Sequence, residues 1–254
     1  MIFDFKKNRL VFMVGLLGTL ILSIILLQLN INADTVFIVS AILALLIWFT
    51  LRRLTVQEVQ QLQVKFMLEC NPVVFKDAYI KLINNRFSYD KRWAITKHQN
   101  VVLGAIFSGD QATAETVLKT TEARFNTIIS KQPVYRYSHA VTHALYAAFY
   151  LDRGDFLEKL DQVSVAYEGL PGNAKKTIEN NLNGFHYWFK LVSDHLLIES
   201  PNPNEFVNKL SELSPFFKIS GYYLLQRMHI TGYEDKLLPE SEHAMFSQTT
   251  LKTF

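Results

Sequence analysis

LVFMVGLLGTLILSIILLQL, residues 10–29, is an apolar stretch that contains no charged side chain. With a rise of about 1.5 Å per residue, a helix of this length spans the roughly 30 Å hydrocarbon core of a bilayer. A polar break over residues 30–34 separates it from a second uncharged run, TVFIVSAILALLIWFTL, which covers residues 35–51. The two runs predict a transmembrane hairpin over residues 1–53, with helices at 10–29 and 35–51.

The charges beside the two runs predict how the hairpin is oriented. Lys6, Lys7 and Arg9 precede the first run and Arg52 and Arg53 follow the second, whereas the break between them carries only an aspartate. The positive-inside rule then places both termini in the cytoplasm. The first run is longer than the about 7–15 apolar residues of a cleaved signal peptide, so a two-pass membrane protein is the favoured interpretation.

Composition limits what the rest of the chain can do. The chain has 254 residues and a formal net charge of +3. The five basic residues beside the two runs, set against Asp4 and Asp34, account for all of it. Residues 54–254 are therefore neutral overall, which gives no general attraction to nucleic acid. Cys70 is the only cysteine, which excludes an intrachain disulfide and a cysteine-based zinc site. We expect the bilayer and a protein partner, and no nucleic acid.

Residues 54–254 have helical spacing and no sustained strand alternation, so the sequence predicts an all-α fold. In residues 54–69 an apolar face formed by Val59, Leu62 and Phe66 predicts a helix that continues beyond the second run. Farther on, Gly109–Asp110 and Gly154–Asp155 have the composition of tight corners between helices. The expected helix pairs are 60–69 with 73–84, 91–108 with 111–129, 135–153 with 156–167, 175–200 with 204–213, and 217–230 with 234–238.

The spacing within two of these pairs resembles the tetratricopeptide (TPR) repeat family. That family has a Trp, Leu-Gly, Tyr pattern in the first helix of a repeat and Ala and Phe in the second. The residues that follow the spacing, with Asn in the place of Trp, are Asn100, Leu103, Gly104, Phe107, Ala114 and Leu118, and more loosely His143, Tyr146, Ala147 and Tyr150. The resemblance implies a TPR-like α-solenoid of four to five helix pairs over residues 54–238. An irregular helical bundle stays open as an alternative.

The last segment, residues 239–254, has no strong periodicity. We expect it to be a frayed or loosely docked tail. In an alternative interpretation, Met245 and Phe254 anchor a partner.

No motif in the sequence indicates a particular chemistry. His139 and His143 stand four apart on an expected helix, so they form half of a helical metal site. The sequence around them supplies no third ligand, and we interpret these histidines as packed or groove-lining residues. Phosphate-binding loops, nucleophile elbows and dinucleotide fingerprints are absent from the sequence. We therefore expect no catalytic residue, no metal and no cofactor, and the chain is not predicted to be an enzyme.

In a solenoid the first helix of each pair lines the concave face. The polar residues on these helices form the predicted partner groove: His98, His139, His143, Asn181 and Arg227. The expected function is a membrane-tethered helical-repeat scaffold or adaptor that recruits a protein at the cytoplasmic face. Two alternatives stay open, namely an accessory subunit of a membrane complex and a membrane-bound enzyme with an unfamiliar helical active site.

Overall fold

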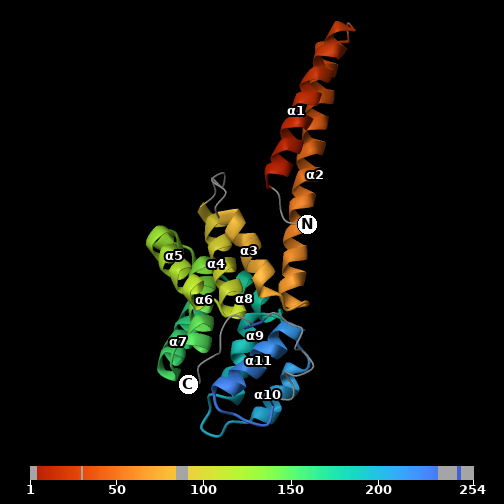
Figure 1. Ribbon diagram of the computed structural model, residues 1–254. Helices are drawn as coiled ribbons and strands as arrows, with labels where there is room; N and C mark the ends of the chain where they lie inside the picture. Colours follow the sequence, from red (N-terminus) through yellow and green to blue (C-terminus); the bar gives the residue numbers. More distant parts are fainter. Residues whose placement is uncertain (1–4, 30, 84–90, 234–244, 247–254) are drawn as a thin grey trace. The chain divides into compact units, whose positions relative to one another are not determined.

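The computed structural model describes residues 5–29, 31–83, 91–233 and 245–246, and all the regular structure in these residues is helical (Figure 1). The predicted all-α class is confirmed. The chain forms two compact units, Met1–Leu62 and Gln63–Phe254. The helices are α1 Phe5–Gln28, α2 Ala33–Met67, α3 Pro72–Ile83, α4 Lys91–Ser108, α5 Gln111–Lys131, α6 Pro133–Tyr150, α7 Arg153–Glu168, α8 Gly172–Glu179, α9 Phe185–His195, α10 Pro203–Leu210 and α11 Pro215–Arg227.

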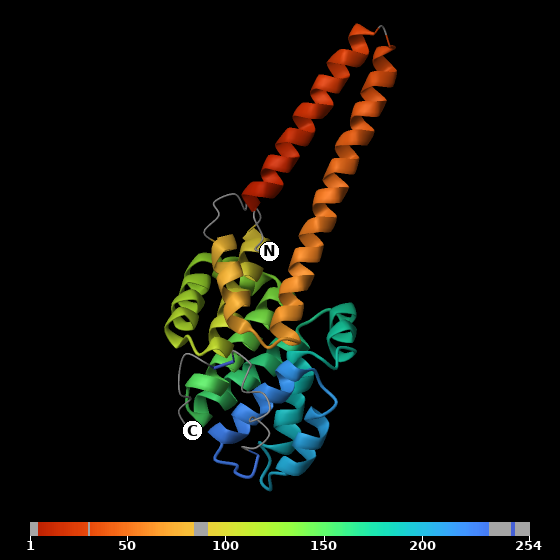
Figure 2. The same ribbon diagram turned by 45° about the vertical axis from the view of Figure 1, so that its right-hand side comes forward.

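The first unit contains α1 and most of α2, which run in opposite directions (Figure 2). They contact each other through a hydrogen bond of 2.6 Å between the hydroxyl groups of Ser23 and Ser40. They also approach at Gly15, where an added Cβ would lie 3.0 Å from the side chain of Ile47. Glycine and serine at such a contact are typical of helices that pack in a membrane.

One helical segment among the described residues is long and apolar enough to cross a membrane by length and composition. It covers Ala33–Thr50 in α2, has a mean hydropathy of 2.1 and is only 6% buried. In α1 the apolar part Phe12–Gln28 is shorter. Helix α2 then continues without a break to Met67, so the predicted extension beyond the apolar run is confirmed.

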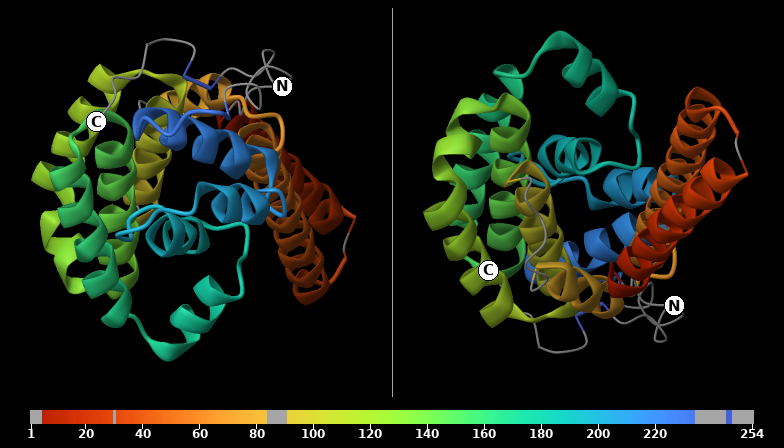
Figure 3. Two further views of the ribbon diagram at one scale, coloured as in Figure 1. Left: turned by 90° about the horizontal axis from the view of Figure 1, so that it is seen from below. Right: turned by 90° about the horizontal axis from the view of Figure 1, so that it is seen from above.

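In the second unit, α3 to α7 pack in sequence as antiparallel neighbours, and α4 also contacts α6. Seen end-on, α9, α10 and α11 form a group on the side of α4 and α6 that faces away from α5 (Figure 3). Helix α9 also contacts α7, where the rings of His186 and Tyr167 stack with their centroids 4.3 Å apart. The predicted corner between α4 and α5 is confirmed. Gly109 has a φ of 87°, and the Asp110 side chain accepts a hydrogen bond of 3.1 Å from the backbone N–H of Thr113.

Two expected boundaries are wrong. Asp152 caps α7 by accepting from the N–H of Asp155 at 2.9 Å, so the corner precedes Gly154, which lies inside the helix. The expected helix over 175–200 is two helices, α8 and α9, with Asn180, Asn181, Leu182, Asn183 and Gly184 between them. Asparagine and glycine are weak helix formers. The Asn183 side chain also accepts a hydrogen bond of 2.7 Å from the backbone N–H of Ser214, which is distant in the sequence.

Aromatic rings fill the core of the second unit around Phe107 of α4. This ring has its centroid 5.3 Å from that of Phe149 and 4.6 Å from that of Phe216. Phe66, at the end of α2, stacks on Phe75 of α3 at 4.4 Å. Aromatic residues that are far apart in the sequence therefore hold α3, α4, α6 and α11 in one core.

Part of the expected tail belongs to this core. Met245 and Phe246 are only 2% and 5% exposed. The N–H of Phe246 donates to the carbonyl oxygen of Phe107 at 2.6 Å, and its ring lies 4.5 Å from that of Tyr223. The expectation of a loose segment is wrong at these two positions, and a buried Met245 cannot anchor a partner. Phe254 and the expected helix 234–238 lie outside the described residues.

Candidate functional site

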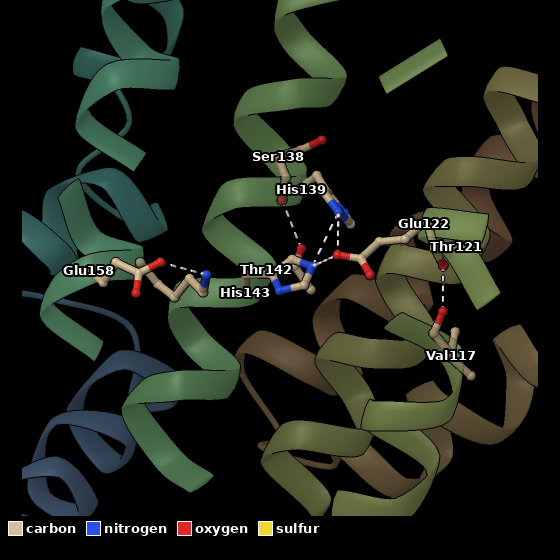
Figure 4. Close-up of polar contacts among 9 residues, drawn as sticks. Val117, Thr121, Glu122, Ser138, His139, Thr142, His143 and Glu158 are labelled. Atoms are coloured by element: carbon tan, nitrogen blue, oxygen red, sulfur yellow. Dashed lines mark hydrogen bonds and ion pairs between the residues drawn. The ribbon is translucent and has the colours of Figure 1, made fainter. Parts of the chain in front are cut away.

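Three side chains of types that can bind a metal ion lie together, Glu122 of α5 and His139 and His143 of α6 (Figure 4). The Nε2 atoms of the two histidines are 3.2 Å apart. Oε1 of Glu122 lies 3.2 Å from Nε2 of His143 and 3.6 Å from Nε2 of His139. The three atoms thus form a nearly equilateral triangle.

The local fold explains this convergence. Residues four apart on a helix point to the same side, which aligns the two imidazoles of α6. Only Gln132 separates the end of α5 at Lys131 from the start of α6 at Pro133. In such a tight antiparallel pair, residues at similar distances from the turn lie at the same height, and Glu122 and His143 meet this condition.

Burial keeps the two imidazoles uncharged near neutral pH. The side chains of His139 and His143 are only 15% and 21% exposed, whereas that of Glu122 is 51% exposed. Desolvation, with smaller contributions from His139 and Lys159, lowers the pKa of His143 to about 4. Desolvation also lowers the pKa of His139, against the opposite effect of the Glu122 carboxylate. Neutral imidazole is the form that binds a metal ion.

The three side chains lie in a cleft of about 410 Å³. Arg136 and Lys159 contribute positive charge to its lining, and Gln162 contributes an amide. Lys159 forms an ion pair of 3.0 Å with Glu158, which lies next to it in the chain. Apart from Glu122, none of the lining side chains is acidic. A small anion is therefore the ligand class that this lining favours.

The structure does not bring the five predicted groove residues into one groove. His98 is 5% exposed, and its Nδ1 lies 3.2 Å from the Thr121 hydroxyl. Arg227 is 2% exposed, and it donates to the carbonyl oxygens of Ala148 and Leu151 at the end of α6. The expectation that these two side chains stay hydrated in an open groove is wrong, because helix packing covers both.

Asn181 lines a different cleft from the one that holds His139 and His143. This second cleft has a volume of about 270 Å³, and its lining contains no carboxylate, lysine or arginine. On α4 and α6, Gln99 donates through Nε2 to the Ser138 hydroxyl at 3.0 Å. The lining residues are Gln99, Asn100, Leu103, Tyr137, Ser138, Val141, Thr142, Ile178, Asn181, Gly184, Phe185 and His186.

Sequence reasoning missed Glu122 as a member of the histidine cluster. Glu122 is on another helix, and nothing in its neighbourhood in the sequence distinguishes it from other exposed glutamates. The signal that was present is the short turn, because Glu122 and His143 lie at nearly the same distance along the chain from Gln132, on either side of it.

No protein-family model, curated protein or solved structure matches this chain. The resemblance to TPR repeats therefore stays a prediction that rests on residue spacing alone.

Proposed function

We propose that this chain is a membrane-tethered helical-repeat scaffold that recruits a protein partner. The single observation that carries the tether is the exposed apolar surface of α2. Large side chains such as Phe37, Leu45 and Phe49 are more than half exposed along a segment that is almost entirely unburied. Water disfavours such a surface, whereas a bilayer accommodates it.

The proposal includes a second membrane span through α1 and cytoplasmic termini. The Ser23–Ser40 hydrogen bond supports it, because α1 and α2 satisfy each other's hydroxyl groups where neither would meet water. The positive-inside rule supports this orientation, because the basic residues lie outside the two apolar runs and not between them, at Lys6, Lys7, Arg9, Arg52 and Arg53. The exposed apolar side chains of α1, including Val14, Leu17 and Leu20, fit lipid contact.

The proposed recruiting surface is the neutral cleft that contains Asn181. Helices α4, α6 and α9 contribute most of its lining, and each of them belongs to a different one of the expected helix pairs. The other lining residues are Ile178 near the end of α8 and Asn181 and Gly184 between α8 and α9. This is the arrangement that a solenoid-like stack uses to present a concave surface. Because the lining combines amides and hydroxyls with apolar groups and carries no formal charge, an uncharged peptide segment is the partner chemistry it fits.

Membrane tethering is tested by an arginine substitution in α2. Ile42→Arg costs about 2.5–3.5 kcal/mol of insertion free energy if the helix spans the bilayer, and should release protein from carbonate-washed membranes. Leu182→Arg is the matched control, because Leu182 is 56% exposed in the second unit. Equal retention of both variants would overturn the tether.

The orientation is tested with protease. Protease added outside intact cells should leave residues 54–254 uncut, and cleavage of these residues from outside would contradict the proposed topology.

Recruitment is tested by site-specific crosslinking in native membranes. A photoreactive residue at Asn181 should capture a discrete partner, and the added substitution Asn100→Arg should abolish that capture by placing a charge in the cleft. The control carries the photoreactive residue at Asn126, an exposed position on α5 outside both clefts. Identical products from the two positions, or capture that survives Asn100→Arg in a folded protein, would contradict the proposed surface.

A further inference from the structure

We propose that Oε1 of Glu122, Nε2 of His139 and Nε2 of His143 bind one divalent transition-metal ion, for which Zn²⁺ is the best fit. This inference goes beyond the scaffold role and does not depend on it. It follows from the positions of three side chains that the sequence places on two different helices.

The distances between the donor atoms match a tetrahedral ion. Zn²⁺ binds imidazole nitrogen and carboxylate oxygen at about 2.0–2.2 Å, so any two ligands of a tetrahedral site are about 3.3–3.6 Å apart. The three distances in the cluster are 3.2, 3.2 and 3.6 Å. An ion therefore fits among the three atoms with little movement of either helix.

The types of donor select the class of metal. Two imidazoles and one carboxylate suit Zn²⁺ and neighbouring first-row ions, whereas Mg²⁺ and Ca²⁺ prefer sites made of oxygen. Each of the three residues contributes its side chain from the middle of a helix of at least 18 residues. Rigid elements hold the donors before the ion arrives, so little ordering entropy opposes binding.

Three protein ligands leave the fourth tetrahedral position open. Structural zinc sites use four protein ligands, whereas sites that exchange water or substrate use three. The three ligands line the same cleft as Arg136 and Lys159, so we infer that the open position faces this cleft. The ligand class that fits is a small anion, such as a phosphate or carboxylate group, which could bind the ion through one oxygen and the two cations through others.

One feature of the surroundings weakens the site. Metal-bound histidines usually donate the N–H of the second ring nitrogen to an acceptor. Nδ1 of His139 is buried and has no hydrogen-bond partner in the described part of the chain. Loss of such an outer contact typically lowers metal affinity by about 10–100-fold, so we expect weaker binding than in a fully supported zinc site.

The test uses the full-length protein, purified in detergent, stripped with chelator and then titrated with Co²⁺ as a spectroscopic probe. One equivalent should produce the intense visible absorption of a tetrahedral site, and Zn²⁺ should displace it stoichiometrically. Elemental analysis after dialysis should find one zinc per chain. A titration without tetrahedral absorption, or without zinc retention near one equivalent, would overturn the proposal.

Three ligand variants and one control decide which residues bind the ion. Glu122→Gln keeps the size of an exposed side chain, and His139→Asn and His143→Asn keep a polar group in place of each imidazole. Each should weaken Co²⁺ binding by more than the about 10–100-fold of an outer-contact change. His195→Ala removes a histidine outside the cluster and should leave binding unchanged. Circular dichroism checks that each variant is folded. Because Glu122 is half exposed, Glu122→Gln should fold normally. Unchanged Co²⁺ affinity in this folded variant would contradict the assignment of Glu122 as a ligand.

Inorganic phosphate tests the open position. Added to the Co²⁺-saturated protein, it should shift the visible spectrum, and Lys159→Gln should reduce the apparent phosphate affinity measured on the Co²⁺-saturated variant. A spectrum that does not respond to phosphate would mean that the fourth position is closed to anions.

Discussion

The guanidinium of Arg227 on α11 donates from Nη1 to the carbonyl oxygen of Ala148 on α6 at 2.9 Å. Its Nη2 donates to the carbonyl oxygen of Leu151 at 2.7 Å. The last turn of a helix leaves carbonyl groups without partners in the helix, and a cation there also stabilises the negative end of the helix dipole. Burial lowers the pKa of Arg227 to about 10, which still leaves it charged at neutral pH.

Arg227→Ala should therefore destabilise the second unit markedly, by about 1–3 kcal/mol for each carbonyl group left unsatisfied. Arg227→Lys should recover part of this loss, because an ammonium group reaches fewer acceptors in this geometry. Thermal unfolding measured by circular dichroism gives both values. Arg153→Ala, at an exposed arginine, is the control. An unchanged melting temperature for Arg227→Ala would mean that these hydrogen bonds contribute nothing net.

Gly104→Ala should destabilise the contact between α3 and α4. An added Cβ would lie 2.8 Å from Cβ of Lys76 and 2.9 Å from its Cα, so the backbone of α3 would have to move. Overpacking of this kind costs about 1–3 kcal/mol. Gly172→Ala is the matched control, since no atom lies within 4 Å of the added Cβ. Equal melting temperatures for the two variants would show that the helices separate at little cost.

Phe246→Ala should cost about 3–5 kcal/mol, as expected for removal of a buried aromatic ring. The ring lies 5.0 Å from Phe149 and contacts Tyr223 and Phe107 as well. Urea unfolding of the variant, compared with Leu182→Ala at an exposed position, measures the loss. The control should stay within about ±0.5 kcal/mol. If both variants unfold at the same urea concentration, the docking of Phe246 adds nothing to stability.

His98 should make stability depend on pH. Desolvation, followed by the charges of Arg124 and Lys97, lowers its pKa in the folded protein below the ordinary value near 6.5. The unfolded chain therefore binds the proton first, so this contribution is fully present above about pH 6.5 and is lost as the pH falls toward the folded-state pKa. The slope from one such histidine is at most about 1.4 kcal/mol per pH unit.

His98→Asn should flatten the decline of the melting temperature between pH 7 and pH 5 relative to the unchanged chain. The comparison isolates His98, because the other histidines titrate in both proteins. Parallel curves for the two proteins would contradict the prediction.

Local sequence signals predicted much of the helical order, and their failures have physical causes. The corner at Gly109–Asp110 follows from a left-handed glycine and a capping aspartate, both of which act within a few residues. The break between α8 and α9 is set partly by a distant contact, the bond from Ser214 to Asn183. The docking of Phe246 depends on a pocket built from α4, α6 and α11, which no local pattern contains.

Only part of the candidate site could be predicted from the sequence, because part of it depends on contacts between helices. The spacing of His139 and His143 fixes their common direction within one helix, and the sequence contains that information. The approach of Glu122 depends on how α5 packs against α6. The burial of His98 and Arg227 likewise comes from neighbouring helices, so the sequence did not distinguish these two from residues that line an open cleft.

The one-residue connection at Gln132 makes the cluster more sensitive to insertions and deletions than to most substitutions. Adding a single residue to α5 after Glu122 would rotate that side chain by about 100° around the helix axis and remove its carboxylate from the face of α6. Many side chains between Glu122 and His139 are exposed and can be exchanged without this effect. During divergence the number of residues in this interval would therefore be under stronger selection than their identity, and a related chain could keep the cluster while sharing little of the sequence around it.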